Sequence, residues 1–204
     1  MKQGRMVRFG DFVFRHRDRL PVPFILIAVL VLVFTRPSFT SSQSRLFLLI
    51  AGGLVILAGE SVRIWAVGYS GGTTRSLKLI ADRLVREGPY SLVRNPLYLG
   101  NFLIALGFSI MANAVVVIPL VIVYFVIEYY PIVVREEHFL LEKFGDDYRR
   151  YLNDVPRFFP KSLRAMKAAY NPSALKGERW TVLGIAGMLV FMIVIDILRV
   201  RLLP

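Results

Sequence analysis

The chain has 204 residues, a formal net charge of +12 and a hydrophobic fraction of 55%. This length suits one domain, and the apolar fraction is high for a soluble one, so we expect membrane spans. With 0 cysteines and 2 histidines, the composition excludes disulfides, thiol catalysis and zinc–thiolate sites. It also excludes membrane oxygenases that hold two irons with many histidines.

The first 19 residues mix aromatic and basic side chains. Phe9, Phe12, Val13 and Phe14 share this stretch with five arginines, a composition typical of an amphipathic helix on the inner leaflet. A solvated basic leader fits the same residues. The basic stretch is long and no small-x-small cleavage site follows the apolar run, so we expect no cleaved signal peptide.

Five apolar segments follow, and they predict an all-α, polytopic membrane protein with about five transmembrane helices. The first is close to the lower length limit for a span. In chain order they are residues 20–35, 46–67, 97–112, 114–134 and 180–198. We expect one membrane-embedded domain over residues 1–204.

Segments rich in Lys and Arg alternate with segments poor in them along the predicted topology. Outside the spans, 6 precede the first segment, 2 lie in the first loop, 5 in the second, 0 in the turn at Asn113, 10 in residues 135–179 and 2 in the tail. The positive-inside rule then places the N-terminus and both long loops in the cytoplasm. Anionic lipid headgroups account for the net charge, so nucleic acid is not a predicted partner.

Two polar features lie at the spans themselves. Glu60 and Arg63 share a helix face and are expected to pair, either as a structural pair or as part of a site. Only Asn113 and its neighbours join the third and fourth spans, which predicts a tight antiparallel hairpin. Residues 82–98 and 135–160 should therefore meet on the cytoplasmic face.

The first motif is "DRLVREGPYSLVRNPLYLG". Gly88-Pro89 indicates a turn, and Asn95-Pro96 indicates the N-cap and first residue of the third span. A well-capped membrane helix explains Asn-Pro by itself. Arg94 beside the free amides and positive dipole end of that helix also suits a carboxylate ligand.

The second motif is "REEHFLLEKFGDDYRRYLNDVPRFFP". Its periodicity predicts a helix that continues beyond the membrane, ends at Gly145 and is followed by a further helical segment that ends at Val155-Pro156. Glu136 and Glu137 suit either an interfacial helix face or a binding site. Consecutive helical residues point about 100° apart, so Glu136, Glu137 and His138 cannot converge on one metal ion. We therefore predict no metal site, and no serine pairs convincingly with His138 for hydrolysis.

Together the two motifs offer an anion site, carboxylates and tyrosines at a lipid-accessible surface. S-adenosylmethionine combines a carboxylate, an ammonium, a flat base and a positive centre. It therefore suits such a set of groups.

The two motifs together resemble those of a known family. "GPYSLVRNPLYLG" followed by "EEHFLLEKFGDDYRRYLNDVPRFFP" is similar to the isoprenylcysteine carboxyl methyltransferases, which are related to the phospholipid N-methyltransferases. The resemblance covers about residues 79–160. It implies a helical membrane enzyme that binds S-adenosylmethionine on the cytoplasmic side and methylates a lipidic acceptor from the bilayer.

The resemblance also implies site residues. With Arg94 from the anion site, the expected cofactor contacts are Asp82, Arg83, Leu84, Val85, Tyr90, Arg94, Asn95, Pro96, Leu97, Tyr98 and Glu136. Glu137 and Tyr148 are the first candidates for a general base if the acceptor is an amine or a hydroxyl.

Two positions depart from the family pattern. Asn95 stands where the family commonly has His, and an amide does not titrate near neutral pH, which argues against proton transfer there. Ile132 stands where the prenylcysteine enzymes have an arginine for the substrate carboxylate. Arg157 is the candidate to replace that arginine.

The resulting hypothesis is a methyltransferase acting on a lipidic or prenylated small substrate at the cytoplasmic face, with carboxyl O-methylation as one possibility. A phospholipid-type N-methyltransferase is the nearest alternative. A sterol-reductase-like enzyme using NADPH and a noncatalytic lipid-binding protein also stay open.

Overall fold

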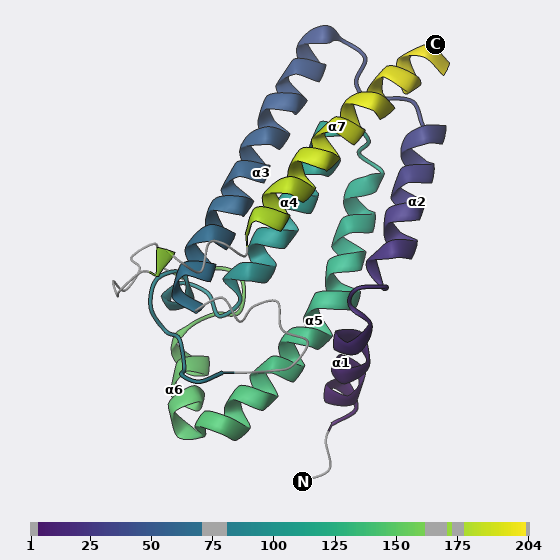
Figure 1. Cartoon of the computed structure of the whole chain (residues 1–204). Coiled ribbons are helices and arrows are strands. Elements are labelled where there is room, and N and C mark those ends of the chain that lie inside the picture. Colours follow the sequence, from purple (N-terminus) through teal and green to yellow (C-terminus); the bar gives the residue numbers. More distant parts are fainter. Residues whose placement is uncertain (1–3, 71–80, 162–170, 173–177, 203–204) are drawn as a thin grey trace.

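The structure is a computed structural model, which describes residues 4–70, 81–161, 171–172 and 178–202. The described residues form seven α-helices and the short 3₁₀ helix η2 (Pro89–Ser91), which confirms the predicted all-α fold. The helices are α1 (Arg5–His16), α2 (Pro21–Phe34), α3 (Ser42–Ser70), α4 (Pro96–Met111), α5 (Val117–Phe144), α6 (Asp146–Asp154) and α7 (Arg179–Leu202). Helices α1 and α6 lie at one end of the bundle and the last turns of α7 lie at the other (Figure 1).

Each predicted span coincides with a helix. Among the described residues, α3 and α5 are long and apolar enough to cross a membrane. The other three apolar helices, α2, α4 and residues Arg179–Ile195 of α7, are shorter. With 28 residues, α5 is about 42 Å long and outreaches a hydrocarbon layer of about 30 Å. That all five apolar helices cross the membrane remains a prediction.

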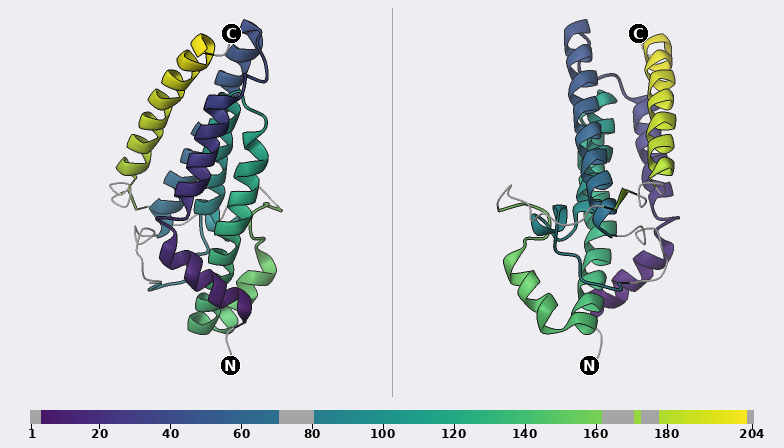
Figure 2. Two further views of the ribbon diagram at one scale, coloured as in Figure 1. Left: turned by 90° about the vertical axis from the view of Figure 1, so that its right-hand side faces the viewer. Right: turned by 60° about the vertical axis from the view of Figure 1, so that its left-hand side comes forward.

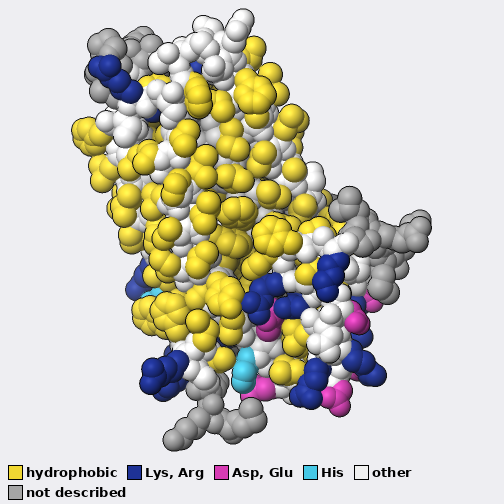
Figure 3. All heavy atoms as spheres, turned by 180° about the vertical axis from the view of Figure 1, so that it is seen from behind, with side chains coloured by type: hydrophobic (Ala, Val, Ile, Leu, Met, Phe, Trp, Pro, Cys, Tyr) yellow, Lys and Arg dark blue, Asp and Glu magenta, His cyan; other side chains and the backbone are white. Residues whose placement is uncertain are grey.

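The surface divides into an apolar body and a charged end. Many large apolar side chains are exposed on α2, α3, α5 and α7, among them Leu26, Phe47, Leu57, Val126 and Val190. Figure 3 shows apolar side chains over the upper body, with most of the visible charged side chains around the lower end. This distribution is consistent with a membrane protein.

Glycines bring α3 and α4 into backbone contact. A Cβ on Gly100 would lie 2.7 Å from the Gly59 carbonyl oxygen, and one on Gly107 would lie 2.7 Å from that of Gly52. Within each helix the two glycines are seven residues apart, so they share a face two turns apart. Small residues at such positions allow membrane helices to approach closely.

Replacing Gly100 by Leu should separate α3 from α4. The new side chain meets backbone, which cannot move aside as a flexible side chain can, so we expect a loss of about 3 kcal/mol, or roughly 6–12 °C in thermal midpoint. The check is thermal unfolding of the purified protein in detergent. Gly53→Leu is the matched control, because nothing lies within 4 Å of a Cβ on Gly53. Equal midpoints for the two variants would contradict the packing role.

The predicted tight hairpin between α4 and α5 is confirmed. Asn113 adopts a positive φ of 50° at the turn. Its side chain accepts a hydrogen bond from the Phe39 amide at 3.0 Å and donates one to the Phe39 carbonyl at 2.6 Å. Arg199 of α7 donates to the carbonyls of Thr35 and Ala112. These bonds join α2, α7 and the hairpin at the end of the bundle away from α6; α7 lies at the edge of the bundle (Figure 2).

Helix α1 packs across α5 near the opposite end. Val13 and Phe14 form a buried cluster with Ile132, and a Cβ on Gly10 would collide with the Pro131 carbonyl. Phe12 remains exposed on another side of α1. The amphipathic helix is thus confirmed, and a wholly solvated leader is wrong for the described residues. Its place on the inner leaflet stays a prediction.

Candidate functional site

The segments on either side of the hairpin meet, as predicted. The Tyr98 hydroxyl donates to Glu136 Oε1 at 2.6 Å, and the Arg94 amide donates to the Pro156 carbonyl at 2.9 Å. These contacts place the start of α4, the end of α5 and the segment after α6 around one region. The region lies toward the end of the bundle that carries α6 (Figure 1).

A glycine turn leads into this region. Gly88 has a φ of +59°, and a Cβ there would lie 2.6 Å from the Tyr69 ring, so the turn requires glycine. The turn leads into η2, where the Tyr90 carbonyl accepts a hydrogen bond from the Tyr151 hydroxyl at 2.6 Å. Burial raises the pKa of Tyr90, so this phenol stays protonated at neutral pH.

Helix α4 begins where the sequence predicts it. Asn95 is the N-cap residue and Pro96 the first helical residue. The expected side-chain capping bond is absent: Asn95 makes no cap hydrogen bond and instead donates from Nδ2 to the Arg157 carbonyl at 3.5 Å. The prediction of that bond was wrong, because residues after α6 pack across the helix start and engage the amide.

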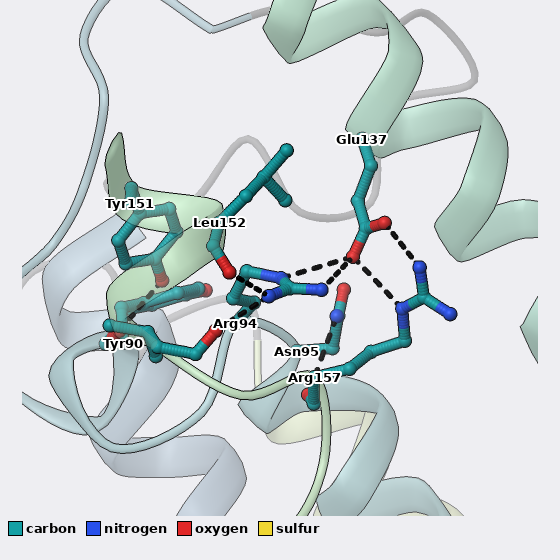
Figure 4. Close-up of polar contacts among 8 residues, drawn as sticks. Tyr90, Arg94, Asn95, Glu137, Tyr151, Leu152 and Arg157 are labelled. Atoms are coloured by element: carbon teal, nitrogen blue, oxygen red, sulfur yellow. Dashed lines mark hydrogen bonds and ion pairs between the residues drawn. The ribbon is translucent and has the colours of Figure 1, made fainter. Parts of the chain in front are cut away.

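Glu137 is held by two arginines (Figure 4). Arg94 donates from Nε and Nη2 to Glu137 Oε1 at 3.1 and 3.0 Å. Arg157 donates from Nε to Oε1 at 3.0 Å and from Nη2 to Oε2 at 2.5 Å. Hydrogen bonding to Glu137 raises the pKa of Arg157. The carboxylate is thus stabilised as an anion by two cations.

Arg94 also ties α6 to this cluster. Its Nη1 donates to the Leu152 carbonyl at 2.9 Å and to the Val155 carbonyl at 2.5 Å. All three guanidinium nitrogens therefore bind within the protein. This use differs from the predicted role of Arg94 as a cofactor anion site.

Tyr148 on α6 is only 1% exposed, and its ring centroid lies 5.8 Å from that of Tyr151. Burial, and then the charge of Glu137, raise its pKa. Such a phenol is protonated at neutral pH and would be a poor proton acceptor.

An aromatic wall extends from Tyr98 along α5. The rings of Tyr98 and Tyr129 are 5.0 Å apart, and Phe125 lies 4.9 Å from Tyr129 and 5.5 Å from Phe158. Asn101 donates to the Tyr129 hydroxyl at 3.3 Å. Tyr129 and Asn101 were not among the predicted site residues. The only signal in the sequence that could have identified these two residues is their helical spacing from Glu136 and Tyr98.

A buried polar cluster adjoins this wall. The predicted pair is confirmed, with Arg63 Nε 3.5 Å from Glu60. Arg63 also donates to Asn101 and, at 2.9 Å, to Glu178. Through Asn101, this cluster connects Tyr129 with α3 and with Glu178, the residue before α7.

The remaining predicted positions lie around the Gly88 turn and the start of α4. Asp82 and Arg83 are exposed, whereas Leu84, Val85 and Leu97 are half-buried and Pro96 is buried. Arg83 donates to the Tyr69 carbonyl at 3.2 Å and lies 3.6 Å from Glu87. In the described part of the chain, no three His, Cys, Asp or Glu side chains group as metal ligands would.

Comparisons with known proteins give one family and two relatives. The model of the phospholipid methyltransferase family, a family of membrane methyltransferases, matches residues 47–147. The chain is 27% identical over 151 residues to the nickel-cobalt-cadmium resistance protein NccN of Alcaligenes xylosoxydans xylosoxydans, covering 74% of this chain and 68% of that protein. It is 30% identical over 154 residues to the cobalt-zinc-cadmium resistance protein CzcN of Cupriavidus metallidurans, covering 74% and 67%.

Those two names describe resistance to metal ions and state no reaction. No solved structure matches the chain. The family match runs from α3 to the start of α6 and includes the Tyr98–Glu136 contact. On these grounds the chain belongs to the phospholipid methyltransferase family.

Proposed function

We propose that the chain is an S-adenosylmethionine-dependent methyltransferase that acts on a lipidic acceptor at the cytoplasmic membrane face. In this proposal α2, α3, α4, α5 and α7 are the five spans and the N-terminus is cytoplasmic. The observation that carries it is the contact of Glu136 with Tyr98, within the segment matched by the family model. That contact lies at the N-terminus of α4, beside an aromatic wall.

The groups around Glu136 suit the parts of the cofactor. The half-buried carboxylate of Glu136 would hold the ammonium group. The first amides of α4, after Pro96, would hold the carboxylate in place of Arg94, whose donors bind Glu137 and α6. The faces of Tyr98 and Tyr129 suit the base or the positive centre. When bound, S-adenosylmethionine supplies an electrophilic methyl group on its sulfonium.

The protein's part in such a reaction is alignment and exclusion of water. Direct displacement at a sulfonium methyl requires both, and it requires no covalent intermediate. We assign Glu137 and Arg157 to positioning, because they bind each other in a cluster that fixes the end of α5. Tyr148 packs against Tyr151 within α6. An acceptor that is already anionic would then need no general base.

The test uses purified protein with methyl-labelled cofactor and native membrane lipids. We expect a labelled lipid product, together with micromolar binding of S-adenosylhomocysteine by calorimetry. Binding of nicotinamide dinucleotides instead would favour the reductase alternative. Cofactor binding without any labelled lipid would favour a noncatalytic lipid-binding protein.

The same experiment separates two kinds of acceptor. The description of the matched family favours a phospholipid acceptor, for which N-methylation is the alternative, whereas the absence of an assigned base in the proposal above favours a carboxylate. Mild alkali releases a methyl ester as methanol but leaves an N-methyl group in place. The stability of the label to alkali therefore distinguishes carboxyl O-methylation from N-methylation.

A further inference from the structure

The side of α1 that faces away from α5 carries exposed apolar and basic side chains. Phe9 and Phe12 are 45% and 52% exposed. Arg8 and Arg15 are also exposed, and seven residues place them on one side of the helix, two turns apart. Within the described part of the chain neither arginine forms an ion pair. This outer face of α1 (Arg8, Phe9, Phe12 and Arg15) therefore combines apolar contact area with positive charge.

A groove of about 290 Å³ opens on α1, and all of its lining side chains belong to that helix: Arg8, Asp11, Phe12, Arg15 and His16. The carboxylate of Asp11 already has a partner, because Arg135 donates a hydrogen bond to it. Two arginines therefore leave the groove with a positive charge, next to the apolar ring of Phe12. This combination suits an anionic group attached to an apolar body.

The place of α1 in the fold favours a lipid surface as the source of that anion. Helix α1 lies oblique to the long helices, at the end of the bundle where the apolar helix α2 begins (Figure 2). The large apolar side chains Val22, Ile25 and Leu26 at the start of α2 are exposed. If α2 enters the hydrocarbon layer, α1 lies at the level of the lipid headgroups, where basic and aromatic side chains bind anionic bilayers.

The inner face of α1 packs against the candidate site. Phe14 is 2% exposed and clusters with Ile132 of α5, and Tyr98 of α4 packs against that cluster. The Tyr98 hydroxyl in turn donates to Glu136 at 2.6 Å. One layer of side chains therefore separates α1 from the contact that carries the proposed function.

An ion pair also joins α1 to the residue before Glu136. Arg135 donates to Asp11, and its Cζ lies 4.2 Å from the ring centroid of Phe14. Both of these partners are on α1. Movement of α1 away from α5 would deprive a half-buried guanidinium of its carboxylate. The position of Glu136 at the end of the span thus depends on how firmly α1 is held.

We propose that the outer face of α1 binds anionic lipid headgroups of the bilayer, and that this contact holds α1 on α5 and strengthens cofactor binding at Glu136 and Tyr98. The lipid contact does not depend on enzymatic activity, whereas its effect on the cofactor rests on the proposed function. The surface charge of the membrane would then regulate the enzyme through a helix outside the site of reaction.

The first measurement detects lipid contact at α1. The chain has 2 tryptophans, Trp65 and Trp180, so Phe12→Trp in a Trp65→Phe/Trp180→Phe background reports on the outer face alone. Quenching by brominated phosphatidylglycerol or brominated phosphatidylcholine, in nanodiscs that contain both lipids, gives their relative affinity. We expect phosphatidylglycerol to be preferred at least about fivefold. Arg8→Gln/Arg15→Gln in that background should abolish the preference.

The second measurement is calorimetry of S-adenosylhomocysteine binding in nanodiscs with and without phosphatidylglycerol. We expect the affinity of the wild type to be at least about fivefold higher with the anionic lipid, and no difference in Arg8→Gln/Arg15→Gln. Asp11→Asn breaks the ion pair with Arg135. This variant should keep the lipid preference but lose its effect on affinity.

Arg149→Gln/Arg150→Gln is the matched control, because it removes the same charge from exposed arginines of α6 and should change neither measurement. Equal quenching by the two lipids, or an unchanged preference in folded Arg8→Gln/Arg15→Gln, would overturn the lipid site. A lipid preference with equal S-adenosylhomocysteine affinity in both nanodiscs would overturn the regulation. Failure of the wild type to bind S-adenosylhomocysteine in either nanodisc would count against the proposed function, whereas quenching would still decide the lipid site.

Discussion

Glu136→Gln should abolish most of the affinity for S-adenosylhomocysteine. Glutamine keeps the size and one acceptor of the side chain but removes the charge that the ammonium group requires. Loss of one partner from a hydrogen-bonded charge pair costs about 2–4 kcal/mol. This loss corresponds to a dissociation constant roughly 30- to 700-fold larger. Calorimetry on the purified variant measures this change, and methyl transfer should fall with it.

Two further variants separate the charge of Glu136 from its surroundings. Glu142→Gln removes a carboxylate from an exposed position on the same helix and should leave affinity unchanged. Tyr98→Phe removes the hydroxyl that donates to Glu136 at 2.6 Å but keeps the carboxylate, so its loss should be smaller. Unchanged affinity in Glu136→Gln would mean that the ammonium group binds elsewhere.

Much of the fold could be predicted because its signals are local. Long apolar runs predict the positions of α2, α3, α4, α5 and α7. Gly145, with a φ of 54°, ends α5 where the sequence indicates a cap. The few residues around Asn113 require an antiparallel hairpin, which brings the start of α4 beside the later turns of α5, where Tyr98 meets Glu136.

The roles of the two adjacent glutamates could not be predicted from composition. Consecutive helical residues point about 100° apart, so Glu136 meets Tyr98 whereas Glu137 meets Arg94 and Arg157. Which arginines would meet Glu137 depends on how the chain after α6 returns across α4.

Replacing Arg94 by Met should destabilise the whole end of the bundle that carries α6. The change leaves the Leu152 and Val155 carbonyls and part of the Glu137 carboxylate without their donor. Breaking a buried ion pair on one side costs about 3–5 kcal/mol, or roughly 6–20 °C in thermal midpoint for a chain of this length. Thermal unfolding in detergent measures the loss.

The comparison that decides the role of Arg94 combines stability with ligand affinity. Arg157→Met should cost less, because Arg157 is more exposed than Arg94 and Glu137 keeps Arg94 as a partner. Arg150→Met breaks an ion pair between exposed side chains and should leave the thermal midpoint unchanged. Arg94→Lys keeps the positive charge but cannot reach Glu137, Leu152 and Val155 at once, so it should lower the midpoint as well. If Arg94→Lys instead weakened S-adenosylhomocysteine binding at an unchanged midpoint, Arg94 would be a cofactor ligand rather than the tie between α4, α5 and α6.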